Sequence, residues 1–186
     1  MLPDRGPARL AAWGAVAVAV ALLHNRLWAT FNLAFFTAIS KNLGRNIFGN
    51  GFGGDYLLIN LTGPTLARVL QQTEPHEYAR LHLVVLLLGL GAVIVVAHRR
   101  FGYEVARLLC ILVAASPALT VCMEWLGQPD ALTFPLAFGI VVARRRPAAF
   151  ALAALLGLTH AEQGAIAALV GTVVRLVIVE AGPDDP

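Results

Sequence analysis

Residues 124–163 read EWLGQPDALTFPLAFGIVVARRRPAAFALAALLGLTHAEQ, two short apolar runs joined by three consecutive arginines. Polar side chains gather at the far ends of both runs. They are Glu124, Gln128 and Asp130 before the first run, and His160, Glu162 and Gln163 after the second. Positive charge beside a transmembrane run marks the cytoplasmic side of the membrane. If both runs cross a bilayer, the arginines are cytoplasmic and the two polar clusters meet on the outer side.

The composition indicates that lipid surrounds most of this chain. Of its 186 residues, 58% are hydrophobic and 13% are charged, whereas soluble domains are about half apolar and about a quarter charged. Inside a bilayer the backbone must pair internally, so spanning segments are helices or strands of a closed barrel. Barrel strands alternate apolar and polar residues, but residues 84–96, VVLLLGLGAVIVV, do not alternate. The predicted fold class is therefore all-α, a polytopic helical membrane protein.

The apolar runs divide residues 1–186 into about six transmembrane helices of a single integral membrane domain. The expected spans cover residues 10–28, 81–97, 108–126, 131–143, 147–160 and 165–179. Arginine-rich inner loops place both termini in the cytoplasm. A basic head before an apolar run is also typical of a signal peptide, but no small-x-small cleavage site follows here. We therefore expect the first helix to be retained.

Residues 29–80 form a long extracytoplasmic loop in this topology. Apolar residues interleaved with polar ones over residues 31–39 predict an interfacial helix with its aromatic face toward lipid. Pro64 is expected to open a second helix that extends to Gln72. The intervening glycines predict a loop with unusual backbone angles. They do not match a phosphate-binding loop, because no Gly-Lys-Ser/Thr follows them.

The charges and cysteines exclude other classes of protein. The net charge is +3, but the basic residues sit at the ends of apolar runs, so topology explains them without a nucleic-acid partner. Arg175, in the last turns of the sixth run, is close enough to its inner end to snorkel. Cys110 and Cys122 fall in one predicted helix about 18 Å apart, beyond the disulfide limit of about 7 Å. We expect both cysteines to be packing residues.

The fourth and fifth runs are short for membrane spans. Each has only about thirteen residues, or roughly 20 Å of helix, against a hydrocarbon core of about 30 Å. These runs are either re-entrant or continue into the polar residues beyond them. In the second case Asp130, His160 and Glu162 lie below the membrane surface, where they must line a wet cavity or pair with each other. The alternatives are that Asp130 is a helix N-cap and that His160 and Glu162 form a polar turn between helices.

The layout resembles that of GT-C-type membrane glycosyltransferases, which use polyprenyl-phosphate sugars. The shared features are an inside N-terminus, one span, a long outer loop with an acidic residue, and then closely spaced spans. Gly-Gly-Asp-Tyr, ending at Asp55 and Tyr56, sits where that family carries its first-loop aspartate. GQPDALT at residues 127–133 and LTHAEQ at residues 158–163 look like the family's outer-end motifs. By this resemblance the chain is a short or partial member.

The resemblance implies transfer of a sugar from a lipid-linked phosphate donor on the outer face of a bacterial plasma membrane. Asp55 would act as general base on the acceptor hydroxyl, or as ligand to a divalent metal, Mg or Mn. The acceptor or the metal would be oriented by Asp130, His160 and Glu162. The lipid phosphate would be met by Lys41 or Arg45, because basic side chains pair with phosphate.

A second interpretation is a non-enzymatic protein, either an accessory membrane subunit or a small lipid-carrier binding or transport protein. Its basis is the small size, which leaves little room for donor and acceptor sites together. The implied partners are the lipid bilayer and a polyprenyl-phosphate-linked sugar, and for an accessory subunit also a larger membrane protein. An Ala, Arg, Gly and Val-rich usage with few lysines indicates a GC-rich genome.

Overall fold

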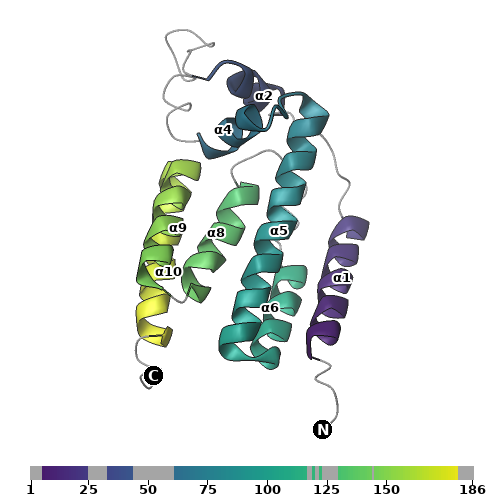
Figure 1. Cartoon of the computed structure of the whole chain (residues 1–186), viewed down its shortest axis with the longest axis vertical. Coiled ribbons are helices and arrows are strands. Elements are labelled where there is room, and N and C mark those ends of the chain that lie inside the picture. The colour runs from purple at the N-terminus through teal and green to yellow at the C-terminus, as the bar shows by residue number, and fades with distance from the viewer. Residues whose placement is uncertain are drawn as a thin grey trace.

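The computed structural model describes residues 6–24, 33–43, 61–116, 119, 122, 130–143 and 145–179, and every regular element among them is an α-helix (Figure 1). The helices are α1 (Gly6–His24), α2 (Leu33–Lys41), α4 (Thr62–Val69), α5 (Pro75–Phe101), α6 (Tyr103–Ala115), α8 (Asp130–Val142), α9 (Arg146–Thr159) and α10 (Ala161–Val179). The all-α prediction is confirmed for this part of the chain.

The six bundle helices α1, α5, α6, α8, α9 and α10 run alternately up and down between two ends (Figure 1). Neighbours in the bundle are α1 and α6, α6 and α5, α5 and α8, and then α8, α9 and α10 together. Helices α2 and α4 lie at one end, which we call the cap end. The opposite end is the arginine end, where α5 finishes with His98, Arg99 and Arg100 and α9 begins at Arg146.

Helix α5 is the longest element, with 27 residues or about 40 Å of rise. Pro75 opens it with a preset φ, the Glu74 N–H donates to the Glu77 carboxylate at 3.4 Å, and Gly102 ends it with φ of 86°. Among the described residues, α5 alone is long and apolar enough to cross a membrane by length and composition. Residues Ala131–Val142 and Arg146–Thr159 form shorter apolar helices.

The short fourth and fifth runs are confirmed as short helices. Helix α8 has 13 residues and α9 has 14, about 20 Å each. The last carbonyls of α8 are bonded at the arginine end: Arg100 Nη1 donates to Ala143 O at 2.7 Å and to Val142 O at 3.4 Å. Arg175 Nη1 also donates to Ala143 O. The snorkelling expected of Arg175 is wrong. The residue is only 6% exposed, and its guanidinium group donates to this carbonyl instead of reaching solvent.

The predicted third span, residues 108–126, differs from the structure at its start, and of its last ten residues the structure describes only Leu119 and Cys122, both helical. Helix α6 already begins at Tyr103, so the expected inner loop over residues 101–107 is helical except at Gly102. It ends at Ala115 because Ser116 precedes Pro117 and takes an extended backbone with ψ of 129°. Cys110 and Cys122 are both buried and form no disulfide among the described residues, as expected of packing residues.

The predicted orientation of the interfacial helix, α2 in the structure, is wrong. Helix α2 forms where expected, but its apolar face is buried rather than exposed to lipid. Leu33, Phe36 and Ile39 cluster with Ala67 of α4 and Tyr78 of α5. The amphipathic pattern is confirmed, but protein rather than lipid lies against its apolar face, because α4 and the first turns of α5 cover it.

Candidate functional site

The structure brings the ends of the short helices to the cap. Helix α8 begins at Asp130, α9 ends at Thr159, and α10 begins at Ala161, all at the end where α2 and α4 lie (Figure 1). The Leu61 N–H donates to Leu158 O at 3.3 Å, which ties the start of α4 to the end of α9. Asp130, His160 and Glu162 therefore share one end of the bundle, as the two-run pattern predicted.

His160 is the single residue between the end of α9 and the start of α10. Its carbonyl accepts the Gly164 N–H at 2.7 Å, and its imidazole Nδ1 lies 3.4 Å from the Gln163 N–H, in position to cap α10. Glu162 is exposed in the first turn of α10, where a negative charge interacts favourably with the helix dipole. These contacts are those of a polar turn between helices. The orienting role implied for both residues stays a prediction.

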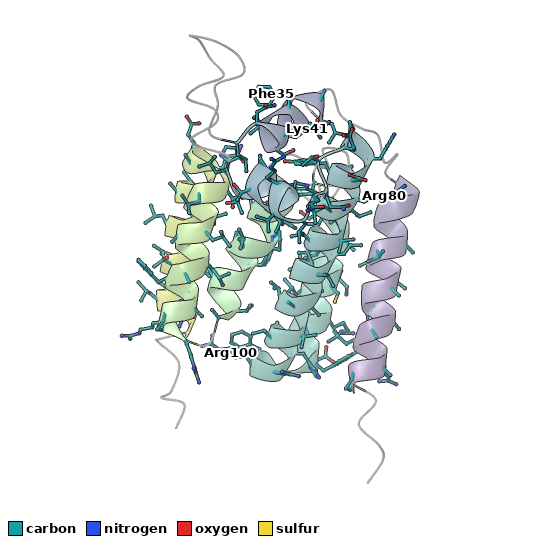
Figure 2. The ribbon with its side chains drawn as sticks, turned by 45° about the horizontal axis from the view of Figure 1, so that its top comes forward. Phe35, Lys41, Arg80 and Arg100 are labelled. Carbon is teal, nitrogen blue, oxygen red and sulfur yellow. The ribbon has the colours of Figure 1, made fainter. Side chains whose placement is uncertain are left out.

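Lys41 is held at the cap by an ion pair. Its Nζ lies 2.7 Å from Glu74 Oε1, joining the end of α2 to the residue before α5, and both side chains remain substantially exposed. Figure 2 shows Lys41 and Arg80 at the cap end, far from Arg100. A ligand phosphate at Lys41 would share this ammonium group with Glu74.

Two of the predicted site residues, Asp55 and Arg45, lie outside the described residues, so their roles stay predictions. Within the described ranges, no three His, Cys, Asp or Glu side chains gather as a metal site would require. The Mg or Mn site was expected to depend on Asp55, and it also stays a prediction.

A buried polar pair beneath the cap was missed by the sequence reasoning. Tyr78 and His82 stack at 4.3 Å between ring centroids, and His82 Nδ1 donates to Tyr78 O at 2.8 Å. The Tyr78 hydroxyl is buried without a hydrogen-bond partner among the described residues. Gly63 of α4 lies directly over the pair, since a Cβ there would be 2.8 Å from His82 Nε2. The available signal was a histidine inside an apolar run, four residues after a tyrosine.

An apolar groove of about 540 Å³ opens along the bundle between α4, α5, α8 and α9. It begins at Thr62 and Leu66 beneath the cap and ends at Val142 and Ala143 near the arginine end. From Leu132 to Val142 it follows α8 for about 15 Å. Its remaining walls are Val85, Gly89, Ala92, Val93, Val96, Pro135, Leu136, Gly139, Leu152 and Leu155.

Small residues bring the groove helices together. A Cβ at Gly89 of α5 would lie 2.7 Å from Pro135 Cβ of α8, and a Cβ at Gly139 would lie 3.2 Å from Leu152 Cδ1 of α9. Because neither glycine carries a side chain, the helices approach closely at these points. The groove has the shape and polarity to hold a hydrocarbon chain, with its polar end among the cap residues.

Comparisons with protein families, curated proteins and solved structures returned no match to this chain.

Proposed function

We propose that this chain is a polytopic membrane protein that binds a polyprenyl-phosphate-linked sugar, with the lipid chain in the apolar groove and the sugar phosphate at the cap end. The groove is the observation that carries the proposal. It is lined by apolar side chains of three bundle helices, and only at the cap does it meet polar groups such as Thr62.

The proposed topology has six spans in a bacterial plasma membrane, with the arginine end and both termini cytoplasmic. It is supported by the alternating direction of the six bundle helices and by the basic residues at one end. The short α8 and α9 would span with help from local thinning of the bilayer, at a modest energetic penalty.

Sugar transfer at the cap is the further part of the proposal, and it rests on the resemblance to GT-C enzymes. Asp55 would accept the proton of the acceptor hydroxyl while that oxygen bonds to the anomeric carbon. The bond from that carbon to the phosphate oxygen would break, leaving the lipid phosphate. Lys41 and Arg45 would stabilise the negative charge left on this phosphate.

A specific observation favours lipid-carrier binding without transfer as the second candidate. His160 Nδ1 faces the start of α10, and Lys41 is paired with Glu74. Both groups therefore have structural contacts. A binding or accessory subunit needs the groove but no general base.

The test uses purified full-length protein in lipid nanodiscs, titrated with a polyprenyl-phosphate sugar. Ala92 lines the groove, so Ala92→Phe places a ring inside it, whereas Leu88→Phe changes a side chain that is 69% exposed and outside the groove. Displacing two methylenes of the chain removes about 0.8 kcal/mol each. We therefore expect Ala92→Phe to weaken binding by about ten-fold and Leu88→Phe to leave it unchanged.

Asp55→Asn separates the two candidates. Loss of transfer with retained donor binding supports the enzyme, whereas donor binding without transfer in the wild type supports the accessory protein. Equal donor affinity in Ala92→Phe and wild type would overturn the groove assignment.

A further inference from the structure

Two buried polar side chains, Tyr78 and His82, lie on the cap side of the apolar groove. Both belong to α5, and His82 precedes Val85, the first α5 residue of the groove, by about 4.5 Å along the helix. Spacings of four and three residues place Tyr78, His82 and Val85 on one side of α5. The pair therefore continues the line of the groove toward the cap, where the groove wall begins at Thr62 of α4.

One polar atom from each side chain faces Gly63 of α4. A Cβ at Gly63 would lie 2.8 Å from His82 Nε2 and 3.2 Å from the Tyr78 hydroxyl oxygen. Both atoms are thus close to a single point, and Gly63 keeps that point free of a side chain. The two rings are held in place by their stacking, at 4.3 Å between centroids, and neither residue is more than 1% exposed.

The hydrogen bond already made by the pair leaves one donor and one acceptor. His82 Nδ1 donates to Tyr78 O at 2.8 Å, so in the neutral imidazole Nε2 carries no hydrogen and can only accept. The Tyr78 hydroxyl has no hydrogen-bond partner among the described residues, and it can donate. An ionised phosphate group only accepts, so it would leave Nε2 without a partner. A hydroxyl group both donates and accepts, so it would satisfy both atoms.

The Tyr78 hydroxyl lowers the stability of the free protein. A buried polar group without a partner carries a desolvation penalty, whereas a phenylalanine would fill the same space without that penalty. Buried groups of this kind are exceptional in native structures, and a functional role is one of their explanations. The hydroxyl is therefore a group whose partner arrives with a ligand.

We propose that Tyr78 and His82 bind a hydroxyl group of the donor's sugar. The Tyr78 O–H donates to the sugar oxygen, and the sugar O–H donates to His82 Nε2. The inference rests on the proposed donor binding, and it names the two side chains that recognise the sugar rather than the phosphate or the lipid chain.

The sugar reaches the pair only when the start of α4 moves, because Gly63 covers both atoms in the free protein. Helix α4 has eight residues, and the Leu61 N–H before it donates to Leu158 O of α9 at 3.3 Å, which is long for a hydrogen bond. We expect this bond to open when the donor binds, so that the amide hydrogen of Leu61 exchanges faster in the complex.

The test titrates purified full-length protein in lipid nanodiscs with polyprenyl-phosphate glucose and, separately, with polyprenyl phosphate. Tyr78→Phe removes only the hydroxyl, and Tyr103→Phe, at the start of α6 near the arginine end, is the matched control. One neutral hydrogen bond contributes about five-fold in affinity, or about 1 kcal/mol. We expect Tyr78→Phe to weaken binding of the glucose-bearing lipid by about five-fold and to leave binding of polyprenyl phosphate unchanged. Tyr103→Phe should match the wild type with both lipids.

Thermal unfolding without either lipid supplies a second readout. Tyr78→Phe should unfold at the wild-type temperature or above it, because the substitution removes a buried group that has no partner. A lower unfolding temperature would overturn the proposal, since it would mean that a permanent water or protein group already satisfies the hydroxyl and that its role is structural.

The binding results separate this inference from the proposed function. Ala92→Phe fills the groove and should weaken both lipids alike. If the wild type binds both lipids with equal affinity, or if Tyr78→Phe weakens both equally, the pair does not recognise the sugar and this inference alone fails. If neither lipid binds the wild type, the proposed function fails and this inference fails with it.

Discussion

Among the described glycines, Gly164 should be the one at which an added methyl group is least tolerated. It is buried at the start of α10, and its N–H donates to His160 O at 2.7 Å. A Cβ at this position would overlap the Leu156 carbonyl oxygen and lie 2.9 Å from the carbonyl carbon. These atoms are backbone of α9 and cannot rotate away. Gly164→Ala must therefore push the start of α10 away from the end of α9.

The magnitude follows from a comparison with Gly157→Ala. In the described part of the chain, nothing lies within 4 Å of a Cβ at Gly157, which is on the neighbouring helix. Both substitutions gain the same helix propensity, about 0.5–1 kcal/mol, so this term cancels between them. Overpacking typically destabilises by about 1–3 kcal/mol. We expect a difference near the upper end of that range, because the clash is with backbone.

Thermal unfolding of both variants in identical nanodiscs, followed by circular dichroism, measures the difference. One kcal/mol shifts the Tm of a domain of this size by about 2–4 °C. Gly164→Ala should thus unfold several degrees below Gly157→Ala, and Gly157→Ala should unfold at or slightly above the wild-type temperature. Coincident transitions for the two variants would mean that α9 and α10 are not in close contact at their junction.

Two further substitutions test the two ends of the bundle. Arg100→Gln removes the donor to Val142 O and Ala143 O and should destabilise the protein by about 1.5–3 kcal/mol. Arg99 is exposed, so Arg99→Gln should change stability little. Equal effects of the two variants in the same unfolding assay would contradict the role of the Arg100 bonds. Lys41→Gln removes the exposed ion pair with Glu74 and should reduce stability by less than about 1 kcal/mol. Amide hydrogen exchange in α2 should therefore rise only slightly. Complete loss of protection in α2 would show instead that this ion pair holds the cap in place.

The short helices could be predicted because charged and polar residues mark both ends of each apolar run. Arginines mark the junction between α8 and α9, which begins at Arg146, and polar residues end both runs, so the pattern predicted two short helices close to the observed 13 and 14 residues. The end of α6 at Ala115 follows from Ser116-Pro117, because proline disfavours a helical backbone at the residue before it.

The tertiary partners of polar and amphipathic residues could not be predicted. An amphipathic helix shows which face is apolar but not whether lipid or protein covers it, and α2 packs on α4 and α5. The sequence shows a histidine four residues after Tyr78, but it does not show that Gly63 covers Tyr78 and His82. For the candidate site, the pattern predicted that His160 and Glu162 lie at the same end as Asp130. It did not predict that the His160 ring faces the start of α10.

The two arginines on Ala143 also set an order for assembling the chain. Arg100 precedes this carbonyl in the sequence by 43 positions, so it is already present when α8 is made. Arg175 follows 32 positions later, which is about 2–6 s at a synthesis rate of about 5–20 residues per second. During that interval the newly made α8 has only one of its two arginine donors. The bundle is closed at this end only after α10 has been made.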